Sequence, residues 1–296
     1  MKIATLGPQG TYSQQAALLF AKRLSPSAND TDIELVFTTI NNSLRLVQNY
    51  QADYAVVPAE NMIDGLIGST FDALIEFQDF VKVCDEVSLS IKHSLGAAPG
   101  ANWNKIQHIY SHPSALNQCQ NQLEELFPQA TLIPLVSTAE AAERVLHDQS
   151  LSSAAICSPA SIKAHGLDVF PEEIQDYLLN ETRFLACSLT DSAPTGNDRT
   201  LLAVRYGENH PGQLYQTAKY LADVQVDLTF IQSRPYKVKP QEYVLIYEFK
   251  GHKAQPQVQA ALRNIELQVR NSGGWKKILG SYPKREREDT NNGIIS

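Results

Sequence analysis

The sequence predicts an α/β protein with two domains, and three observations lead to this fold class. Over roughly the first two thirds of the 296 residues, short apolar runs alternate with segments of helical spacing, which predicts mainly parallel sheets with helices on both faces. Residues 188–198 are rich in Ser, Thr, Pro and Gly, a composition typical of a linker. The pattern then changes to strand, helix, strand, strand, helix, strand, which is the βαββαβ order of ferredoxin-like domains.

The first domain begins with an apolar strand at residues 2–6, which Gly7-Pro8-Gln9-Gly10 ends before helical spacing starts at Ser13. Because strands and helices alternate from there on, polar residues at the ends of the strands are expected to gather along one edge of a sheet. Further strands are expected at residues 33–37, 54–57, 81–91, 106–110, 131–135 and 154–156, and helices at residues 13–24, 40–49, 114–127, 139–147 and 159–165.

The second domain is shorter, with strands expected at residues 200–206, 226–233, 243–249 and 278–279 and helices at residues 212–221 and 256–271. Pro256 suits the first turn of its helix, where a missing N–H has no cost. From Lys284 onward the chain is charged and polar, which predicts a disordered tail. We therefore expect domains at residues 1–188 and 199–283, followed by the tail at residues 284–296.

Composition excludes several classes of function. Lys and Arg number 25 against 32 Asp and Glu, a net charge of −7 that argues against a nucleic-acid binder. The four cysteines form no CxxC pair, which favours free thiols in a reducing compartment. No signal peptide is apparent and no apolar stretch approaches the ~20 residues that span a bilayer, so we expect a cytoplasmic protein. Histidines, cysteines and carboxylates lack the spacing of metal ligands, and no metal or other cofactor is expected.

Two polar segments follow strands near the amino terminus. Thr11 and Ser13 place hydroxyl groups beside the free N–H donors at a helix start, which suits a carboxylate or phosphate. Alternatively, Ser13 is only a helix cap. Glu60 and Asn61 follow the strand at 54–57, at the end where α/β clefts open, although the same residues would also suit a simple turn.

Three further segments lie later in the first domain. Ser111 and Thr138 mark strand-to-helix junctions that together resemble one side of an anion cleft, although Ser111 would serve equally as a cap. A nucleophilic pair of Ser111 with the neighbouring His112 is disfavoured, because adjacent side chains rarely reach the required geometry. In Asn180-Glu181-Thr182-Arg183-Phe184, Arg183 can hold a carboxylate with two hydrogen bonds. The alternative is a strand that carries one solvated arginine.

Taken together and in this order, these segments resemble the prephenate dehydratase family. The matching stretches are LGPQGTYS from Leu6, VPAEN with Gly65, EVSLSIKHSL from Glu86, SHPSALNQC from Ser111, STAEAA from Ser137 and NETRF from Asn180. The remainder of the chain resembles the ACT regulatory domain that follows this enzyme. The resemblance implies a two-lobed catalytic domain, similar to a periplasmic binding protein, and a ferredoxin-like ACT domain.

The resemblance also implies the reaction, in which prephenate loses water and carbon dioxide to give phenylpyruvate for phenylalanine biosynthesis. Such a carbon–oxygen lyase must bind two carboxylates and stabilise a departing hydroxide. By resemblance, Thr182 acts on the leaving hydroxyl, while Glu60 and Asn61 orient the substrate or the threonine. The residues expected to bind substrate are Thr11, Ser13, Ser111, Thr138, Arg183 and Phe184.

For the ACT domain the resemblance implies L-phenylalanine as the effector and assembly as a homodimer or homotetramer. The expected effector site comprises Gly212, Gln213, Leu214, Gln232, Ser233, Arg234 and Pro235. Three positions depart from the family pattern: Met62 replaces a usual Ser, Gln213 a usual Ala and Gln232 a usual Glu. The first departure removes a hydroxyl from an expected active-site loop, and the other two leave the identity and sign of the effector open.

Two alternatives from other classes are carried forward. A prephenate decarboxylase would release carbon dioxide and keep the hydroxyl, but relatives of that kind lack the Thr-Arg-Phe stretch found at Thr182. A sensor without catalytic activity would bind a carboxylate or amino acid and change shape. A bifunctional enzyme with chorismate mutase is disfavoured by the early position of LGPQGTYS, so a monofunctional enzyme is expected.

Overall fold

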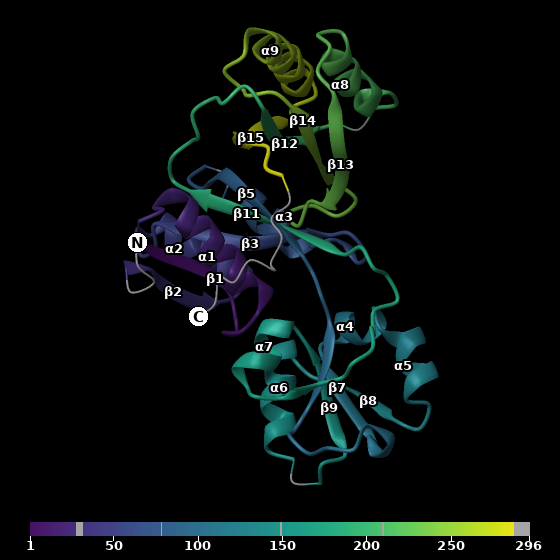
Figure 1. The fold of residues 1–296 in the computed structure, drawn as a ribbon. Helices are drawn as coiled ribbons and strands as arrows, with labels where there is room; N and C mark the ends of the chain where they lie inside the picture. Colours follow the sequence, from purple (N-terminus) through teal and green to yellow (C-terminus); the bar gives the residue numbers. More distant parts are fainter. Residues whose placement is uncertain (28–31, 78, 149, 209, 287–296) are drawn as a thin grey trace.

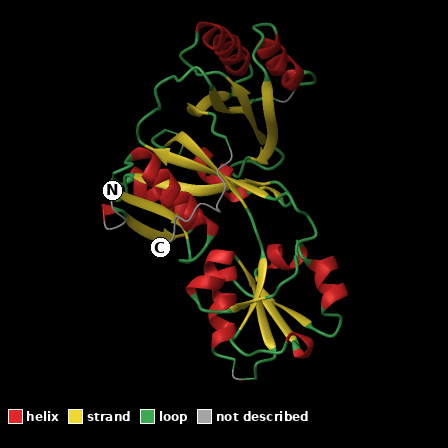
Figure 2. Cartoon of the chain, in the orientation of Figure 1, coloured by secondary structure: helices red, strands yellow, loops and turns green. Residues whose placement is uncertain are grey.

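The computed structural model describes residues 1–27, 32–77, 79–148, 150–208 and 210–286, and it contains three separate β-sheets with their helices. The sheet of a first lobe lies in the middle of the molecule, with the sheet of a second lobe on one side and a C-terminal sheet on the other (Figures 1 and 2). The α/β fold class that the sequence predicts is confirmed.

The first lobe has the strand order β2-β1-β3-β11-β5, and β4 also pairs with β3. The strand β1 is parallel to β2 and β3, whereas β11 is antiparallel to β3 and β5, so the sheet is mixed rather than mainly parallel as expected. The sheet is mixed because the chain returns from the second lobe as β11, which lies between two strands, β3 and β5, that come much earlier in the sequence. The elements are β1 (Lys2–Leu6), α1 (Tyr12–Leu24), β2 (Glu34–Thr38), α2 (Ile40–Gln48), β3 (Tyr54–Asn61), β4 (Gly65–Leu66), α3 (Gly68–Glu76), β5 (Lys82–Ser90) and β11 (Glu181–Ser188).

The second lobe has the strand order β10-β6-β9-β7-β8. The chain crosses between the two lobes twice. The two crossing segments are hydrogen-bonded to each other, because Ile91 N–H donates to the Asn180 carbonyl at 2.9 Å. The helix expected at 114–127 is interrupted at Cys119, whose backbone (φ −121°, ψ 5°) leaves the helical region. The elements are β6 (Ser94–Ala97), a 3₁₀ turn (Trp103–Lys105), β7 (His108–Ser111), α4 (Pro113–Asn117), α5 (Gln120–Leu126), β8 (Thr131–Pro134), α6 (Thr138–Leu146), β9 (Ser153–Cys157), α7 (Pro159–Ala164) and β10 (Asp168–Val169).

The C-terminal domain forms an antiparallel sheet of order β13-β14-β12-β15, with α8 and α9 on the face turned away from the first lobe (Figure 1). Its elements follow the βαββαβ order: β12 (Asp198–Arg205), α8 (Gln213–Ala222), β13 (Leu228–Pro235), β14 (Tyr243–Lys250), α9 (Pro256–Asn271) and β15 (Trp275–Pro283). The last strand is much longer than the two residues expected, because β15 pairs with β12 along its whole length.

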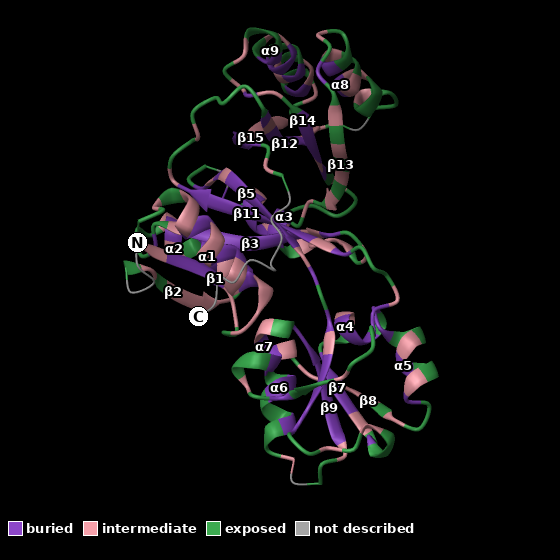
Figure 3. Cartoon of the chain, in the orientation of Figure 1, coloured by how far each residue is buried: buried purple, intermediate pink, exposed green. Residues whose placement is uncertain are grey.

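The other face of the C-terminal sheet shares a hydrophobic core with the first lobe. Leu201, Ile246 and Leu279 belong to the same buried cluster as Phe71 and Val83 of the first lobe. The rings of Phe71 and Phe230 stack across the boundary with their centroids 5.8 Å apart. Figure 3 shows buried residues in the strands on both sides of this boundary. The C-terminal domain is therefore attached by apolar packing and not only by the linker.

The end of the described chain lies against the first lobe. Lys284 N–H donates to the Asn197 carbonyl at 2.8 Å, and the Arg285 guanidinium pairs with Asp85 at 2.8 Å. Residues 284 and 285, which were expected to begin a disordered tail, thus have defined partners: Asn197 just before β12 for Lys284, and Asp85 on β5 for Arg285. The rest of the expected tail, residues 287–296, lies outside the described residues.

The four cysteines are free, as the sequence predicts. Within the described ranges, no helix combines the length and the apolar character needed to cross a bilayer. Those same ranges contain no group of three or more His, Cys, Asp or Glu side chains placed to hold a metal ion.

Candidate active site

A cavity of about 260 Å³ lies between the first and second lobes, and we call it the cleft. Polar side chains enter the cleft from the start of α1, from the end of β3 and the turn after it, from the start of β11, from the starts of α4 and α6, and from the connections β5–β6 and α4–α5. They are Thr11, Tyr12, Ser13, Asn61, Asp64, His93, His112, Ser114, Gln118, Ser137, Thr138 and Thr182. The strand-to-helix junctions identified in the sequence therefore meet at one place.

The hydroxyl of Thr182 is held by Asn61 on the neighbouring strand. The two residues are direct partners in the β3–β11 register, and Asn61 Nδ2 donates to Thr182 Oγ1 at 2.9 Å. The amide orientation of Asn61 is set by its Oδ1, which accepts from the backbone N–H groups of Ile63 and Asp64 at 2.9 Å. Among the described residues no acceptor is in place for the Thr182 O–H, so the hydroxyl can accept from Asn61 and still donate into the cleft.

Asn61 also begins a buried hydrogen-bond network that reaches the second lobe. Its Nδ2 donates to Asn180 Oδ1 at 2.8 Å, and Asn180 Nδ2 donates to Gln118 Oε1 at 2.8 Å. The sequence analysis assigned no role to Asn180 or Gln118, although both lie in the stretches that carry the family resemblance. Their partnership joins residues 62 positions apart, and no local pattern indicates it.

His93 lies where the chain first crosses between the lobes, and it completes this network. Its Nε2 donates to Gln118 Oε1 at 2.9 Å, since that oxygen can only accept. Its Nδ1 is buried and has no hydrogen-bond partner among the described residues. Burial lowers the pKa of His93 below its ordinary value of 6.5, which favours the neutral ring. The sequence predicted only a structural or surface histidine here.

Asp64 links the two lobes across the cleft. Its Oδ2 accepts hydrogen bonds from Ser114 Oγ and, at 2.8 Å, from Gln118 Nε2. Asp64 lies in the turn after β3, whereas both donors belong to the second lobe. These contacts hold the lobes together around the cavity.

Two helices point their amino-terminal ends at the cleft from opposite lobes. The first residue before α1, Thr11, makes no side-chain cap and instead donates from Oγ1 to the Pro8 carbonyl at 2.9 Å. The first N–H groups of α1 therefore remain available to a ligand. Across the cavity, α6 begins at Thr138, with Ser137 Oγ accepting from Glu140 N–H at 3.1 Å. The positive ends of two helix dipoles suit an anion with two charged groups.

The chain is similar to proteins of one enzyme family along most of its length. The model of the prephenate dehydratase family matches residues 3–191. The chain is 35% identical to the bifunctional chorismate mutase/prephenate dehydratase of Aquifex aeolicus over 285 residues, covering 96% of this chain and 74% of that protein. It is 30% identical to the prephenate dehydratase of Methanocaldococcus jannaschii over 279 residues, covering 93% and 96%. The chain belongs to the prephenate dehydratase family.

A solved structure of a family member has the same overall arrangement. The prephenate dehydratase of Arthrobacter aurescens, in complex with L-Phe, aligns with a TM-score of 0.84 and 30% sequence identity over 97% of this chain and 91% of that one. The prephenate dehydratase of Staphylococcus aureus aligns with a TM-score of 0.76 at 23% identity, which supports the fold.

Nine residues of the present chain were predicted to take part in catalysis or substrate binding. Six of them line the cleft: Thr11, Ser13, Asn61, Thr138, Thr182 and Phe184. Ser111 does not, because its side chain is fully buried and donates to the Ile156 carbonyl at 2.7 Å. Glu60 and Arg183 do not line it either. Side chains alternate along a strand, so Asn61 and Thr182 face the cleft while Glu60 and Arg183 face the C-terminal domain.

The placement of Arg183 corrects its expected role. Its guanidinium pairs with Glu60 at 3.3 Å and with Glu248 at 2.6 Å instead of facing a substrate carboxylate. Among the described residues that line the cleft there is no lysine or arginine, and Asp64 is the one carboxylate. An anion in the cleft would therefore rely on helix ends and hydroxyl groups.

Met62, which stands where the prephenate dehydratase family usually has serine, lies outside the cleft. Its side chain is 64% exposed and borders the hollow that also contains Arg183. The substitution therefore removes no hydroxyl from the cleft cavity.

The seven residues predicted to bind an effector do not lie together. Gly212, Gln213, Leu214 and Ser233 line a cavity of about 620 Å³ in the C-terminal domain. Arg234 instead pairs with Asp72 of α3, with its Nε and Nη2 donating at 2.8 and 2.9 Å. Gln232 Nε2 donates to the Ser233 carbonyl at 3.1 Å, and Pro235 ends β13; neither lines the cavity.

Proposed function

We propose that this protein converts prephenate to phenylpyruvate in the cleft, with release of water and carbon dioxide. Membership of the prephenate dehydratase family supports the reaction class. The observation that carries the assignment to the cleft is the Thr182 hydroxyl, which accepts from Asn61 and keeps its proton for a ligand. The Asn61 amide fixes the position of the threonine oxygen, and the threonine O–H can then donate a hydrogen bond to a leaving hydroxide.

In this reaction the bond between the ring and its carboxylate breaks, carbon dioxide departs, and the electron pair of that bond enters the ring. The ring hydroxyl is expelled as hydroxide, which takes up one proton from solvent to form water. Negative charge develops on the departing oxygen, and Thr182 stabilises it by donating a hydrogen bond. The Asn61 amide strengthens that donation, because a hydroxyl that accepts a hydrogen bond becomes a better donor.

The two carboxylates of prephenate are held, in this proposal, at the two helix ends that flank the cleft. One is placed at the uncapped start of α1 and the other at the start of α6. The ring lies between them against apolar side chains of the cavity, among them Ile91 and Phe184. Local backbone dipoles would then bind a dianion although the whole chain carries a net charge of −7.

The variant Thr182→Val tests the role of the hydroxyl. It keeps the shape of the side chain, and Asn61 Nδ2 retains Asn180 Oδ1 as an acceptor, so the protein should fold normally. Turnover of prephenate should fall by about 10²-fold or more, the usual effect of removing one such donor. The measurement is the ultraviolet absorbance and mass of the product, with Thr182→Ser as the control that retains the O–H.

A rate for Thr182→Val close to that of the wild-type protein would remove Thr182 from the mechanism. A non-aromatic product from the wild-type protein would indicate decarboxylation without loss of the hydroxyl.

We further propose that residues 199–283 form an ACT regulatory domain that binds L-phenylalanine in a homodimer or homotetramer. The βαββαβ order, the cavity beside Gly212 and the L-Phe complex of the Arthrobacter aurescens relative support this proposal. Calorimetry with L-phenylalanine and sedimentation with and without it would test both parts. The absence of heat and of any change in turnover would contradict regulation by this amino acid.

The four free thiols support action in the cytoplasm.

A further inference from the structure

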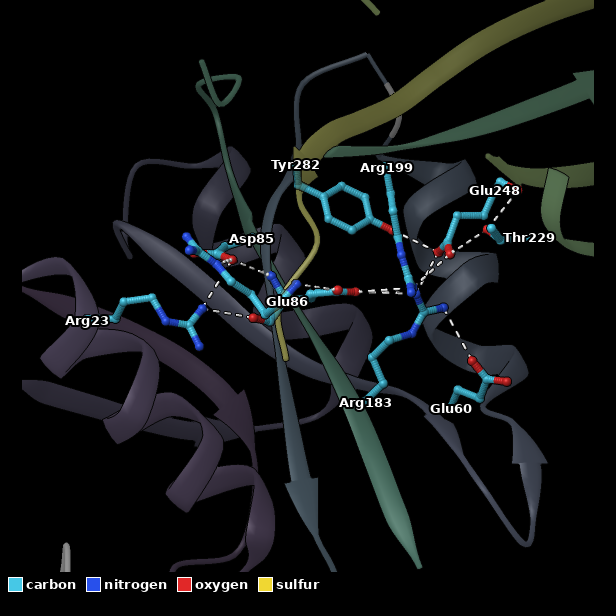
Figure 4. Close-up of polar contacts among 10 residues, drawn as sticks. Arg23, Glu60, Asp85, Glu86, Arg183, Arg199, Thr229, Glu248 and Tyr282 are labelled. Carbon is cyan, nitrogen blue, oxygen red and sulfur yellow. Dashed lines mark hydrogen bonds and ion pairs between the residues drawn. The ribbon is translucent and has the colours of Figure 1, made fainter. Parts of the chain in front are cut away.

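The strand β11 presents two consecutive residues to two different parts of the protein. Thr182 and Phe184 line the cleft, whereas Arg183 between them faces the C-terminal domain. Arg183 is 9% exposed, and its guanidinium points toward a cluster of charged side chains (Figure 4). The side chain that separates the two cleft residues is thus anchored on the opposite side of the sheet.

The principal anchor of Arg183 is Glu248, which lies on β14 of the C-terminal domain and is 1% exposed. Arg183 Nη1 donates to Glu248 Oε2 at 2.6 Å, whereas its distance to Glu86 Oε2 is 3.4 Å and that of Nη2 to Glu60 is 3.3 Å. The shortest of the three ion pairs therefore crosses the domain boundary (Figure 4).

Glu248 is itself held from several directions. Its Oε2 also accepts from Tyr282 Oη at 2.9 Å, and its Oε1 accepts from Arg199 Nη1 at 3.0 Å and from Thr229 Oγ1 at 3.2 Å. The arginines and the tyrosine hydroxyl keep the pKa of Glu248 below its ordinary value despite burial. The carboxylate is therefore charged and fixed.

The anchor acts where the β11 pairing is irregular. The register of β11 with β3 shifts between Arg183 and Phe184, because β3 carries an extra residue, Ala59, between their partners Glu60 and Pro58. Bulges redirect the side chains beside them. The bulge therefore lies on β3 next to Glu60, and Arg183, which pairs with Glu60, is anchored beside it, between the two residues of β11 that face the cleft.

We propose that Glu248 is a positioning residue for the cleft, acting through Arg183 on the strand that carries Thr182. This inference rests on the proposed function for its kinetic consequence. It makes a carboxylate of the C-terminal domain part of the support of the candidate active site. Removal of its charge leaves the buried Arg183 guanidinium with its longer contacts to Glu86 and Glu60, so β11 should be held less firmly beside the bulge of β3.

The test uses the full-length variant Glu248→Gln, which keeps the size of the side chain and removes its charge. The expected result is a decrease of about tenfold in kcat for prephenate, with KM changed by less than about twofold. Hydrogen exchange of the β11 amides around Thr182 should become faster in the same variant. Glu248→Asp, which retains the charge, should restore part of kcat.

The matched control is Glu266→Gln in α9, which removes a carboxylate paired with Lys276 at 2.8 Å inside the C-terminal domain. It should leave kcat and β11 exchange unchanged. A second control combines Glu248→Gln with Arg183→Met. If Glu248 acts through Arg183, the double variant should be no slower than Arg183→Met alone.

Three results would overturn the proposal: a loss of thermal stability in Glu248→Gln with unchanged kcat, unchanged exchange of β11, or an additive decrease in the double variant. Failure of the proposed function is distinguishable, because the wild-type protein would then show no turnover of prephenate. In that case the exchange of β11 alone decides whether Glu248 positions the strand.

Discussion

Replacing Gly280 by alanine tests how closely the C-terminal domain is seated on the first lobe. Gly280 lies in β15, an outer strand of its sheet, and faces β5, an outer strand of the first-lobe sheet. A Cβ at this position would lie 2.2 Å from the Val83 carbonyl oxygen and 2.7 Å from the Val83 amide nitrogen. Both neighbours are backbone atoms, so no side chain can rotate away and the strands themselves would have to separate.

The free energy of unfolding should fall by about 2 kcal/mol. Overpacking of a well-packed contact costs up to about 3 kcal/mol. The lower entropy of an unfolded chain with alanine offsets about 0.7 kcal/mol of that. The φ angle of Gly280 is not positive, so alanine introduces no backbone strain and the cost is steric.

Urea denaturation measures this change, and the two tryptophans allow it to be localised. Trp275 begins β15 and reports on the C-terminal domain, whereas Trp103 lies in the second lobe. The control is Gly68→Ala, whose Cβ would meet the guanidinium end of Arg234 at 2.6 Å, a flexible group that can move. The control should lose less than about 1 kcal/mol. If Gly280→Ala unfolds at the same urea concentration as the wild-type protein, the close seating of β15 on β5 is refuted.

Three further predictions concern single residues. Met62→Ser should change kcat/KM by less than about twofold, because the side chain lies outside the cleft; a large gain in a prephenate assay would contradict this placement. Burial lowers the pKa of His93, so the folded protein binds fewer protons than the unfolded chain, and stability should be lost as the pH falls below 6.5. His93→Asn should reduce that loss in urea titrations at about pH 5.5 and 7.5, and an unchanged pH dependence would count against the neutral ring. Arg234→Gln removes a two-point pair with Asp72 and should cost about 1 kcal/mol, less at high salt; a cost independent of salt would exclude an electrostatic origin.

Local pattern predicted most strands and helices within a few residues, because alternating apolar runs and caps are properties of short segments. The α4–α5 interruption at Cys119 and the antiparallel insertion of β11 were not predictable in this way. The interruption depends on the backbone conformation of the single residue Cys119. The insertion of β11 depends on its pairing with two strands, β3 and β5, that lie about a hundred positions earlier in the sequence. Sequence reasoning thus found most units of the first lobe, but it missed α3 (Gly68–Glu76) and the order of the strands.

The candidate site likewise contains residues that local motifs predicted and residues that only tertiary contacts identify. Thr182 and Asn61 were predicted from the motifs that contain them, and the structure places them side by side. Strand alternation alone would have put Thr182 and Arg183 on opposite faces, but only the tertiary structure decides which face borders the cleft. His93 and Gln118 gain their place from a contact between chain segments 25 positions apart, which no period in the sequence expresses.

The hydrophobic core shared by the first lobe and the C-terminal sheet limits how the protein can be divided. The linker after β11 is a boundary along the chain, yet Leu279 and Ile246 lie in one apolar cluster with Phe71 and Val83. A fragment that ends at residue 188 would present that surface to water and would lose Glu248, the partner of Arg183, together with Tyr282, whose hydroxyl donates to Glu248. The two-lobed unit is consequently a poor candidate for fusion to a different C-terminal domain, unless the new domain supplies both an apolar sheet face and a buried carboxylate at the same point.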